Sequence, residues 1–148
     1  MNNFERTKGF LTACGKTPNE KDLSTQIGVH IEELSEFLEC VDICDPWEYE
    51  SLTSSIDSLR RIATRIKKNW CTASIPNRLR VAALDALCDS EVTGNGVAYL
   101  AGFNKVEADK RVLQSNDNKL VYGKPIILEG GKIGKPEGWT PPDLSNCV

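Results

Sequence analysis

The chain has 148 residues, a formal net charge of −3 and a mean hydropathy of −0.33. A chain of this length can bury one core without a disulfide or a metal to hold it together. Its mildly acidic balance argues against duplex nucleic acid and anionic membranes as partners, since both demand clustered Lys and Arg. No segment reaches the apolar length of a membrane span, and the N-terminal sequence MNNFERTKGF carries charge where a secretory signal needs an apolar run.

The cysteine pattern gives little support for a zinc site. The six cysteines form no CxxC pair, and His30 is the only histidine that could join them. A lone histidine of this kind is more often a packing or surface residue than a catalyst. Thiols in a chain without a secretory signal are typical of the reducing cytoplasm, so we expect a cytoplasmic protein.

Helical periodicity begins near the N-terminus. Residues 3–13 predict a short helix closed by Gly15. A second helix is predicted from Leu23, where apolar residues start to recur at steps of three and four. Asp45-Pro46 should end it, because the residue before proline avoids the α region. A third helix is predicted roughly from Tyr49 to Trp70, with an apolar stripe and a basic outer face.

A fourth helix is predicted from about Arg78 to Phe103, with Asn77 as its N-cap. A shorter one should follow from Lys105 to Leu113. After Ser115 the sequence becomes dense in Gly and Pro, with short β-prone pieces. This composition predicts a tail laid over the surface, with a small hairpin within it.

These elements together predict an all-α fold. No internal repeat or low-complexity run divides the chain, and the apolar stripe of each helix needs a partner to cover it. We therefore expect a single domain over residues 1–148. It would be a bundle of four to five helices with a helical core at about 22–115 and an irregular, Gly/Pro-rich C-terminal tail at 116–148.

Carboxylates gather on the predicted second helix. Glu32, Glu36 and Glu39 fall within a narrow arc of the helix, and Glu33 lies beside it. Several carboxylates on one helix face can share a hard cation such as Mg²⁺, which takes about six oxygen ligands. The alternative is a solvated face, because the arc lies opposite the apolar stripe.

The predicted fourth helix carries a second pair. Asp85 and Asp89 lie one turn apart on a mostly apolar face of a mostly apolar helix. Buried unpaired carboxylates are costly, so they would have to be protonated, paired with cations or bound to a metal. Facing the glutamates of the second helix, the pair would complete a carboxylate-lined site in a bundle. Neutral aspartates with N–H partners remain the alternative.

Several motifs resemble one known superfamily. Glu32-Glu33-x-x-Glu36 matches the EExxE half of the metal site in the all-α nucleoside triphosphate pyrophosphohydrolases. These include the MazG-like proteins, the all-α dUTPases and the phosphoribosyl-ATP pyrophosphohydrolases. Residues 84–89, LDALCD, resemble the second half of that site in phage and bacterial members. The likeness covers most of residues 22–144. Its last part is similar to the end of phosphoribosyl-ATP pyrophosphohydrolase-like proteins. The motifs that carry this part are Ser115-Asn116-x-x-Lys119, Gly123-Lys124-Pro125-Ile126, Gly131-Lys132 and Trp139-Thr140-Pro141-Pro142-Asp143-Leu144.

The resemblance implies a MazG-like bundle that hydrolyses (deoxy)nucleoside triphosphates to the monophosphate and pyrophosphate, in control of the nucleotide pool. Mg²⁺, with Mn²⁺ as an alternative, would be the cofactor. Members assemble as dimers or dimers of dimers, so a homodimer or homotetramer is expected, located in the host cytoplasm if the gene is carried by a phage. The resemblance assigns metal binding to Glu33, Glu36, Asp85 and Asp89, activation of water to Glu32, and phosphate binding to Asn116, Lys119 and Lys124.

One departure from the family pattern leaves alternatives open. The second half of the family's site is usually ExxD, and if Asp85 is that Asp, Ala82 stands where the Glu belongs. Asp85 and Asp89 could instead act together, since both spacings keep the side chains on one helix face. The departure also allows a catalytically weakened nucleotide-binding or regulatory module. A third possibility is a helical interaction protein with an acidic face.

Overall fold

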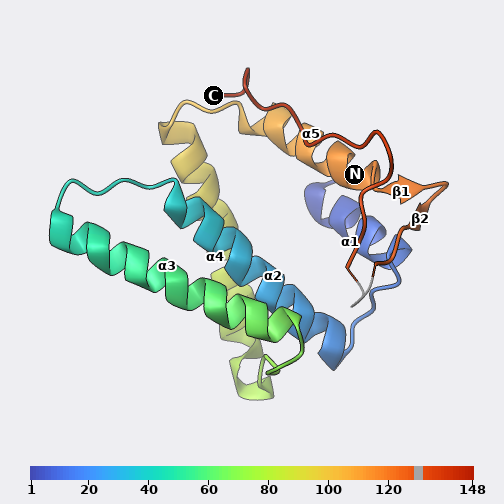
Figure 1. The fold of residues 1–148 in the computed structure, drawn as a ribbon, viewed down its shortest axis with the longest axis horizontal. Coiled ribbons are helices and arrows are strands. Elements are labelled where there is room, and N and C mark those ends of the chain that lie inside the picture. Colours follow the sequence, from blue (N-terminus) through green and yellow to red (C-terminus); the bar gives the residue numbers. More distant parts are fainter. Residues whose placement is uncertain (129–131) are drawn as a thin grey trace. The chain divides into compact units, whose positions relative to one another are not determined.

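The computed structural model describes residues 1–128 and 132–148, so Gly131 of the tail pattern lies outside the described residues. The chain divides into two compact units, residues 18–75 and residues 1–17 with 76–148. Helices dominate the described residues, which confirms the predicted all-α class. The elements are α1 (Asn3–Ala13), α2 (Glu20–Glu39), α3 (Pro46–Lys67), the 3₁₀ turn η1 (Asn77–Leu79), α4 (Arg80–Leu100), α5 (Lys105–Asp117), β1 (Leu120–Val121) and β2 (Lys124–Pro125) (Figure 1).

The unit of residues 18–75 is a hairpin of α2 and α3, which lie side by side (Figure 1). Asn19 caps α2 by accepting a hydrogen bond from the backbone N–H of Asp22. Asp45 caps α3 in the same way, with Pro46 in the first turn, where its missing N–H costs nothing. Asp45-Pro46 therefore begins α3, whereas α2 already ends at Glu39.

Small side chains form the contact between the two helices. Ser24, Gly28 and Ser35 are the buried residues of α2. A Cβ at Gly28 would lie 3.0 Å from Cγ2 of Ile66 and 3.2 Å from the carbonyl oxygen of Ala63. The buried hydroxyl of Ser35 is satisfied because it donates to the carbonyl oxygen of Glu32, 2.6 Å away. The close approach of α2 to α3 thus depends on residues outside the predicted apolar stripe.

Gly28→Val is expected to destabilise the hairpin. The new side chain would meet Ile66 and the backbone of Ala63, and overpacking of this kind costs about 1–3 kcal/mol. Gly9→Ala is the matched control, because a Cβ at this glycine of α1 meets nothing within 4 Å. It should stabilise the chain by up to about 1 kcal/mol through helix propensity. Urea unfolding followed by circular dichroism measures both, and an unchanged midpoint for Gly28→Val would refute the close approach.

In the unit of residues 1–17 and 76–148, α1 packs against α5. The guanidinium of Arg6 forms an ion pair with Asp117, with 2.6 Å between Nη2 and Oδ2. Asn77 does not cap α4 as predicted: it begins η1 and makes no side-chain capping bond, and α4 starts three residues later. Gly102, with a φ of 79°, provides the left-handed residue at the turn from α4 to α5.

The tail contains the predicted hairpin. β1 and β2 pair antiparallel, with Leu120 opposite Pro125. Tyr122 and Gly123 form the tight turn between them, both with positive φ, as the twist of a two-residue hairpin turn requires. The end of the chain then runs along α5 (Figure 1).

Hydrogen bonds fix that end of the chain to α5. The indole N–H of Trp139 donates to the carbonyl oxygen of Ser115 at 2.9 Å. The backbone N–H of Asn104 donates to the carbonyl oxygen of Cys147 at 2.8 Å, and the Cys147 side chain is buried. The tail is therefore an integral part of this unit. Among the described residues, no helix combines the length and apolarity needed to cross a membrane.

Candidate functional site

Two of the carboxylates on α2 form ion pairs with basic residues of α3. Glu32 forms an ion pair with Lys67 of α3, and Glu39 forms one with Arg60. The basic residues of α3 thus partly neutralise the acidic arc, which is not simply a solvated face. The carboxylate of Glu32 is half-buried, and the Lys67 ammonium fixes its position.

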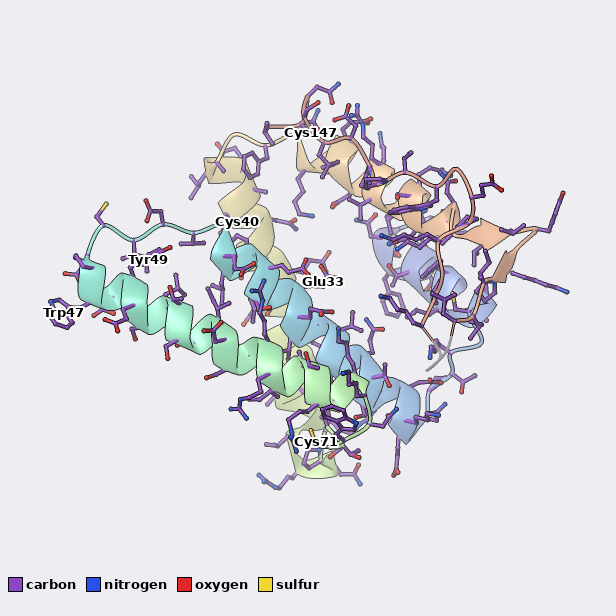
Figure 2. The ribbon with its side chains drawn as sticks, in the orientation of Figure 1. Glu33, Cys40, Trp47, Tyr49, Cys71 and Cys147 are labelled. Atoms are coloured by element: carbon purple, nitrogen blue, oxygen red, sulfur yellow. The ribbon has the colours of Figure 1, made fainter. Side chains whose placement is uncertain are left out.

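Glu33 and Glu36 of the same acidic segment are exposed. Figure 2 shows Glu33 on α2, and Glu36 follows one turn later on the same helix. The structure gives the Glu36 carboxylate no hydrogen bond or ion pair with any other described residue. Its charge is therefore not needed to hold the hairpin together, and its oxygens are available to a ligand.

Asp85 and Asp89 lie one turn apart on α4, and both are exposed. The predicted apolar surroundings are present in the sequence, but the structure does not bury them. Among the described residues of α4, only Ala98 is buried. Leu84 and Val92, on either side of the pair in sequence, are 64% and 68% exposed. The carboxylates are therefore reached by solvent, and the apolar side chains around them need a cover that this unit does not supply.

The predicted metal ligands belong to two different units. Glu33 and Glu36, together with the predicted water-activating Glu32, belong to residues 18–75, whereas Asp85 and Asp89 belong to the other unit. Within residues 1–128 and 132–148, no group of three or more His, Cys, Asp or Glu side chains lies close enough to hold a metal ion. Each helix nevertheless offers a pair of carboxylates, the donors that Mg²⁺ prefers. The four-carboxylate site itself stays a prediction.

The predicted phosphate-binding residues lie at the end of α5 and in the hairpin. Nζ of Lys119 donates to Oδ1 of Asn116 at 2.9 Å and lies 5.5 Å from the ring centroid of Trp139. Lys135 approaches the same ring at 4.5 Å. Lys124 is exposed in β2. Asn116 and Lys119 are thus brought together, and Trp139 helps to position the ammonium group by a cation–π contact.

A groove that the sequence analysis did not single out lies between α5 and the tail. It has a volume of about 620 Å³. The predicted fifth helix ended at Leu113, so the sequence did not place Gln114 one turn after Lys110 on a continuing helix, and periodicity could not show that the tail would lie beside it. The lining residues are Arg6 of α1, four residues of α5, the C-cap Asn118 and four residues of the tail. Those of α5 and the tail are Lys110, Arg111, Gln114, Ser115, Thr140, Pro141, Pro142 and Asp143.

Comparisons of the chain with models of known families, with curated proteins and with solved structures give no match. The resemblance to the all-α nucleoside triphosphate pyrophosphohydrolases therefore rests on the sequence motifs alone. Experiments on the exposed carboxylates are the direct way to test it.

Proposed function

We propose that the chain hydrolyses (deoxy)nucleoside triphosphates to the monophosphate and pyrophosphate, in the cytoplasm, as a MazG-like enzyme of nucleotide-pool control. The observation that carries the proposal is the exposed carboxylate pair on each of two helices, Glu33 with Glu36 on α2 and Asp85 with Asp89 on α4. Glu36 and both aspartates form no ion pair with the described residues. The oxygens of these three carboxylates are therefore free to act as ligands of a hard cation.

These four carboxylates would hold Mg²⁺, which would offset the charge of the triphosphate and polarise its α-phosphorus. Glu32, fixed by Lys67, would orient the attacking water and accept its proton. The water oxygen would bond to the α-phosphorus as the bond from that phosphorus to the oxygen bridging the α- and β-phosphates breaks, so that pyrophosphate leaves. Lys119, positioned by Asn116, would then offset the charge on the departing pyrophosphate, with Lys124 as a further cation.

The exposure of α4 supports assembly into a homodimer or homotetramer. Large apolar side chains are exposed along its length, and exposed apolar surface of this kind is typical of contacts with another chain. The same surface favours a second candidate function, a helical interaction protein that binds another chain through α4. The exposed side chains are Val81, Leu84, Leu87, Val92, Val97, Tyr99, Leu100 and Phe103, the last just beyond the helix.

Hydrolysis should depend on a divalent metal. When the full chain is incubated with each common ribo- and deoxyribonucleoside triphosphate and Mg²⁺, at least one should yield pyrophosphate. EDTA should abolish the release, and excess Mg²⁺ or Mn²⁺ should restore it, because both ions prefer oxygen ligands. Full turnover in EDTA would rule out the carboxylate mechanism. No pyrophosphate from any nucleotide would favour the interaction protein.

A further inference from the structure

The groove between α5 and the tail lies within one unit and is open to solvent. It is lined by Lys110 and Gln114 of α5, by the C-cap Asn118, by Arg6 of α1 and by residues 140–143 of the tail. Its volume is about 620 Å³. None of the carboxylates proposed to bind metal lines it.

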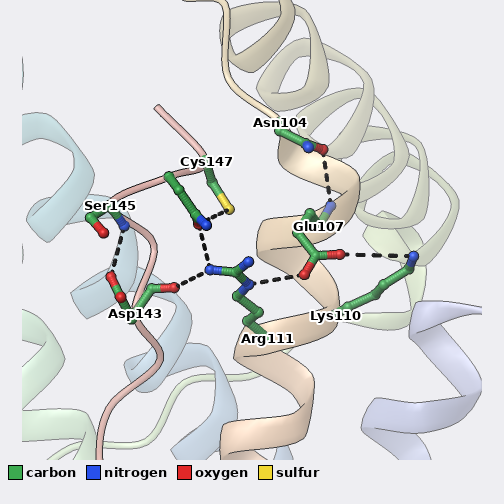
Figure 3. A network of polar contacts seen from close by, with 8 residues as sticks. Asn104, Glu107, Lys110, Arg111, Asp143, Ser145 and Cys147 are labelled. Atoms are coloured by element: carbon green, nitrogen blue, oxygen red, sulfur yellow. Dashed lines mark hydrogen bonds and ion pairs between the residues drawn. The ribbon is translucent and has the colours of Figure 1, made fainter.

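Two arginines of the groove are held in place by hydrogen bonds to neighbouring residues. Arg6 donates to Asp117 through Nη2. Arg111 donates through Nε to Glu107 at 3.0 Å, and through Nη1 to the carbonyl oxygen of Asp143 and to Oδ1 of Asn146 (Figure 3). The bond to Glu107 raises the pKa of Arg111, so its charge is permanent. Both guanidinium groups are thus ordered before any ligand arrives, which lowers the entropic cost of binding.

The lining has more hydrogen-bond donors than acceptors. A guanidinium has five N–H groups, and Nη2 of Arg111 donates to no described residue. The Lys110 ammonium is 67% exposed, with only a 4.0 Å contact to Glu107. Among the described residues, Asp143 is the one carboxylate of the lining. Hydrogen bonds from Ser145 lower its pKa, so it stays charged and is engaged within the tail (Figure 3).

An amide pair extends the lining beyond the cations. Nε2 of Gln114 donates to Oδ1 of Asn118 at 3.0 Å. This bond leaves one acceptor on Gln114 and the donors on Asn118 without a partner among the described residues. Side chains with a remaining donor and acceptor can bind the hydroxyl groups of a sugar or the edge of a base.

We propose that this groove binds a small phosphorylated molecule, with Arg6, Lys110 and Arg111 holding the phosphate group of a phosphate monoester. A phosphate offers only acceptor oxygens under neutral conditions, which is what a donor-rich lining with fixed guanidinium groups requires. A sugar phosphate and a nucleoside monophosphate share this chemistry. The site is separate from the proposed hydrolysis and does not depend on it.

Isothermal titration of the full chain in EDTA, without a triphosphate, tests the proposal. The probes are ribose 5-phosphate, a nucleoside monophosphate and the unphosphorylated nucleoside. The phosphorylated probes should bind and the nucleoside should not. Equal affinity of the two phosphorylated probes would assign a sugar phosphate. Tighter binding of the monophosphate that is lost in Gln114→Ala would assign a nucleotide.

Lys110→Ala should weaken binding about tenfold, as expected for loss of a charged hydrogen bond to phosphate. Lys8→Ala is a close control, because Lys8 is 64% exposed and lies 3.7 Å from a glutamate three residues earlier, much as Lys110 lies 4.0 Å from Glu107. Lys8 does not line the groove. Lys8→Ala and Glu36→Gln should bind like the wild type. No binding of either phosphorylated probe, or equal losses in Lys8→Ala and Lys110→Ala, would overturn the proposal.

Discussion

Glu36→Gln is expected to abolish release of pyrophosphate while leaving the chain folded. The substitution keeps the shape of the side chain but removes the anion that a hard cation requires. Turnover should fall by more than the ~10–100-fold that loss of a residue supporting a metal ligand costs. The side chain is exposed and its carboxylate forms no contact with another described residue, so the unfolding midpoint should not move.

Glu39→Gln provides the matched control for this measurement. Glu39 lies on the same helix, but its carboxylate forms an ion pair with Arg60. Its loss should cost at most about 1 kcal/mol of stability, the usual limit for an exposed pair, and should leave turnover close to the wild-type value. Wild-type turnover in Glu36→Gln would show that Glu36 is only a surface residue. Equal losses in both variants would point to a general effect of charge.

The helices could be predicted from apolar periodicity, but their ends and their contacts could be predicted only in part. The signal for the start of α3 was present in Asp45-Pro46, a cap followed by a first-turn proline. The contact of α2 with α3 was not predicted because it uses Gly28 and small serines. Close approach of two helices selects for small size, whereas the periodicity of apolar residues records only hydrophobicity.

The candidate site was predictable to the same limited degree. The acidic arc of α2 could be read from helical spacing, but the ion pair of Glu32 with Lys67 depends on the register of two antiparallel helices. Nothing within either helix sets that register. The exposure of Asp85 could not be predicted either, because an apolar helix is expected to be covered and its cover is not part of its own sequence.

Asp85→Asn and Asp89→Asn are expected to be equally damaging to hydrolysis. Both carboxylates are exposed on α4 and form no ion pair with the described residues, so neither substitution should affect the fold. A loss of kcat/KM would then report directly on ligand binding. The family pattern places a Glu where Ala82 stands, and the expectation follows if the two aspartates together replace that Glu. Each aspartate would then be a metal ligand, and no neighbouring group could substitute for its charge.

Ala82→Glu tests whether Asp85 and Asp89 together complete the metal site or whether Ala82 marks a vacant ligand position. Ala82 is exposed, and a glutamate there would lie one turn before Asp85 without displacing any packed side chain. If the aspartates already complete the site, the added carboxylate should leave the dependence of kcat/KM on Mg²⁺ unchanged. If Ala82 marks a vacant ligand position, Ala82→Glu should raise the affinity for Mg²⁺ or the rate, and Asp89→Asn should be mild. Measuring kcat/KM for the three variants against Mg²⁺ concentration decides between the two arrangements. If Asp89→Asn leaves kcat/KM unchanged while Ala82→Glu raises it, Asp89 is not a metal ligand.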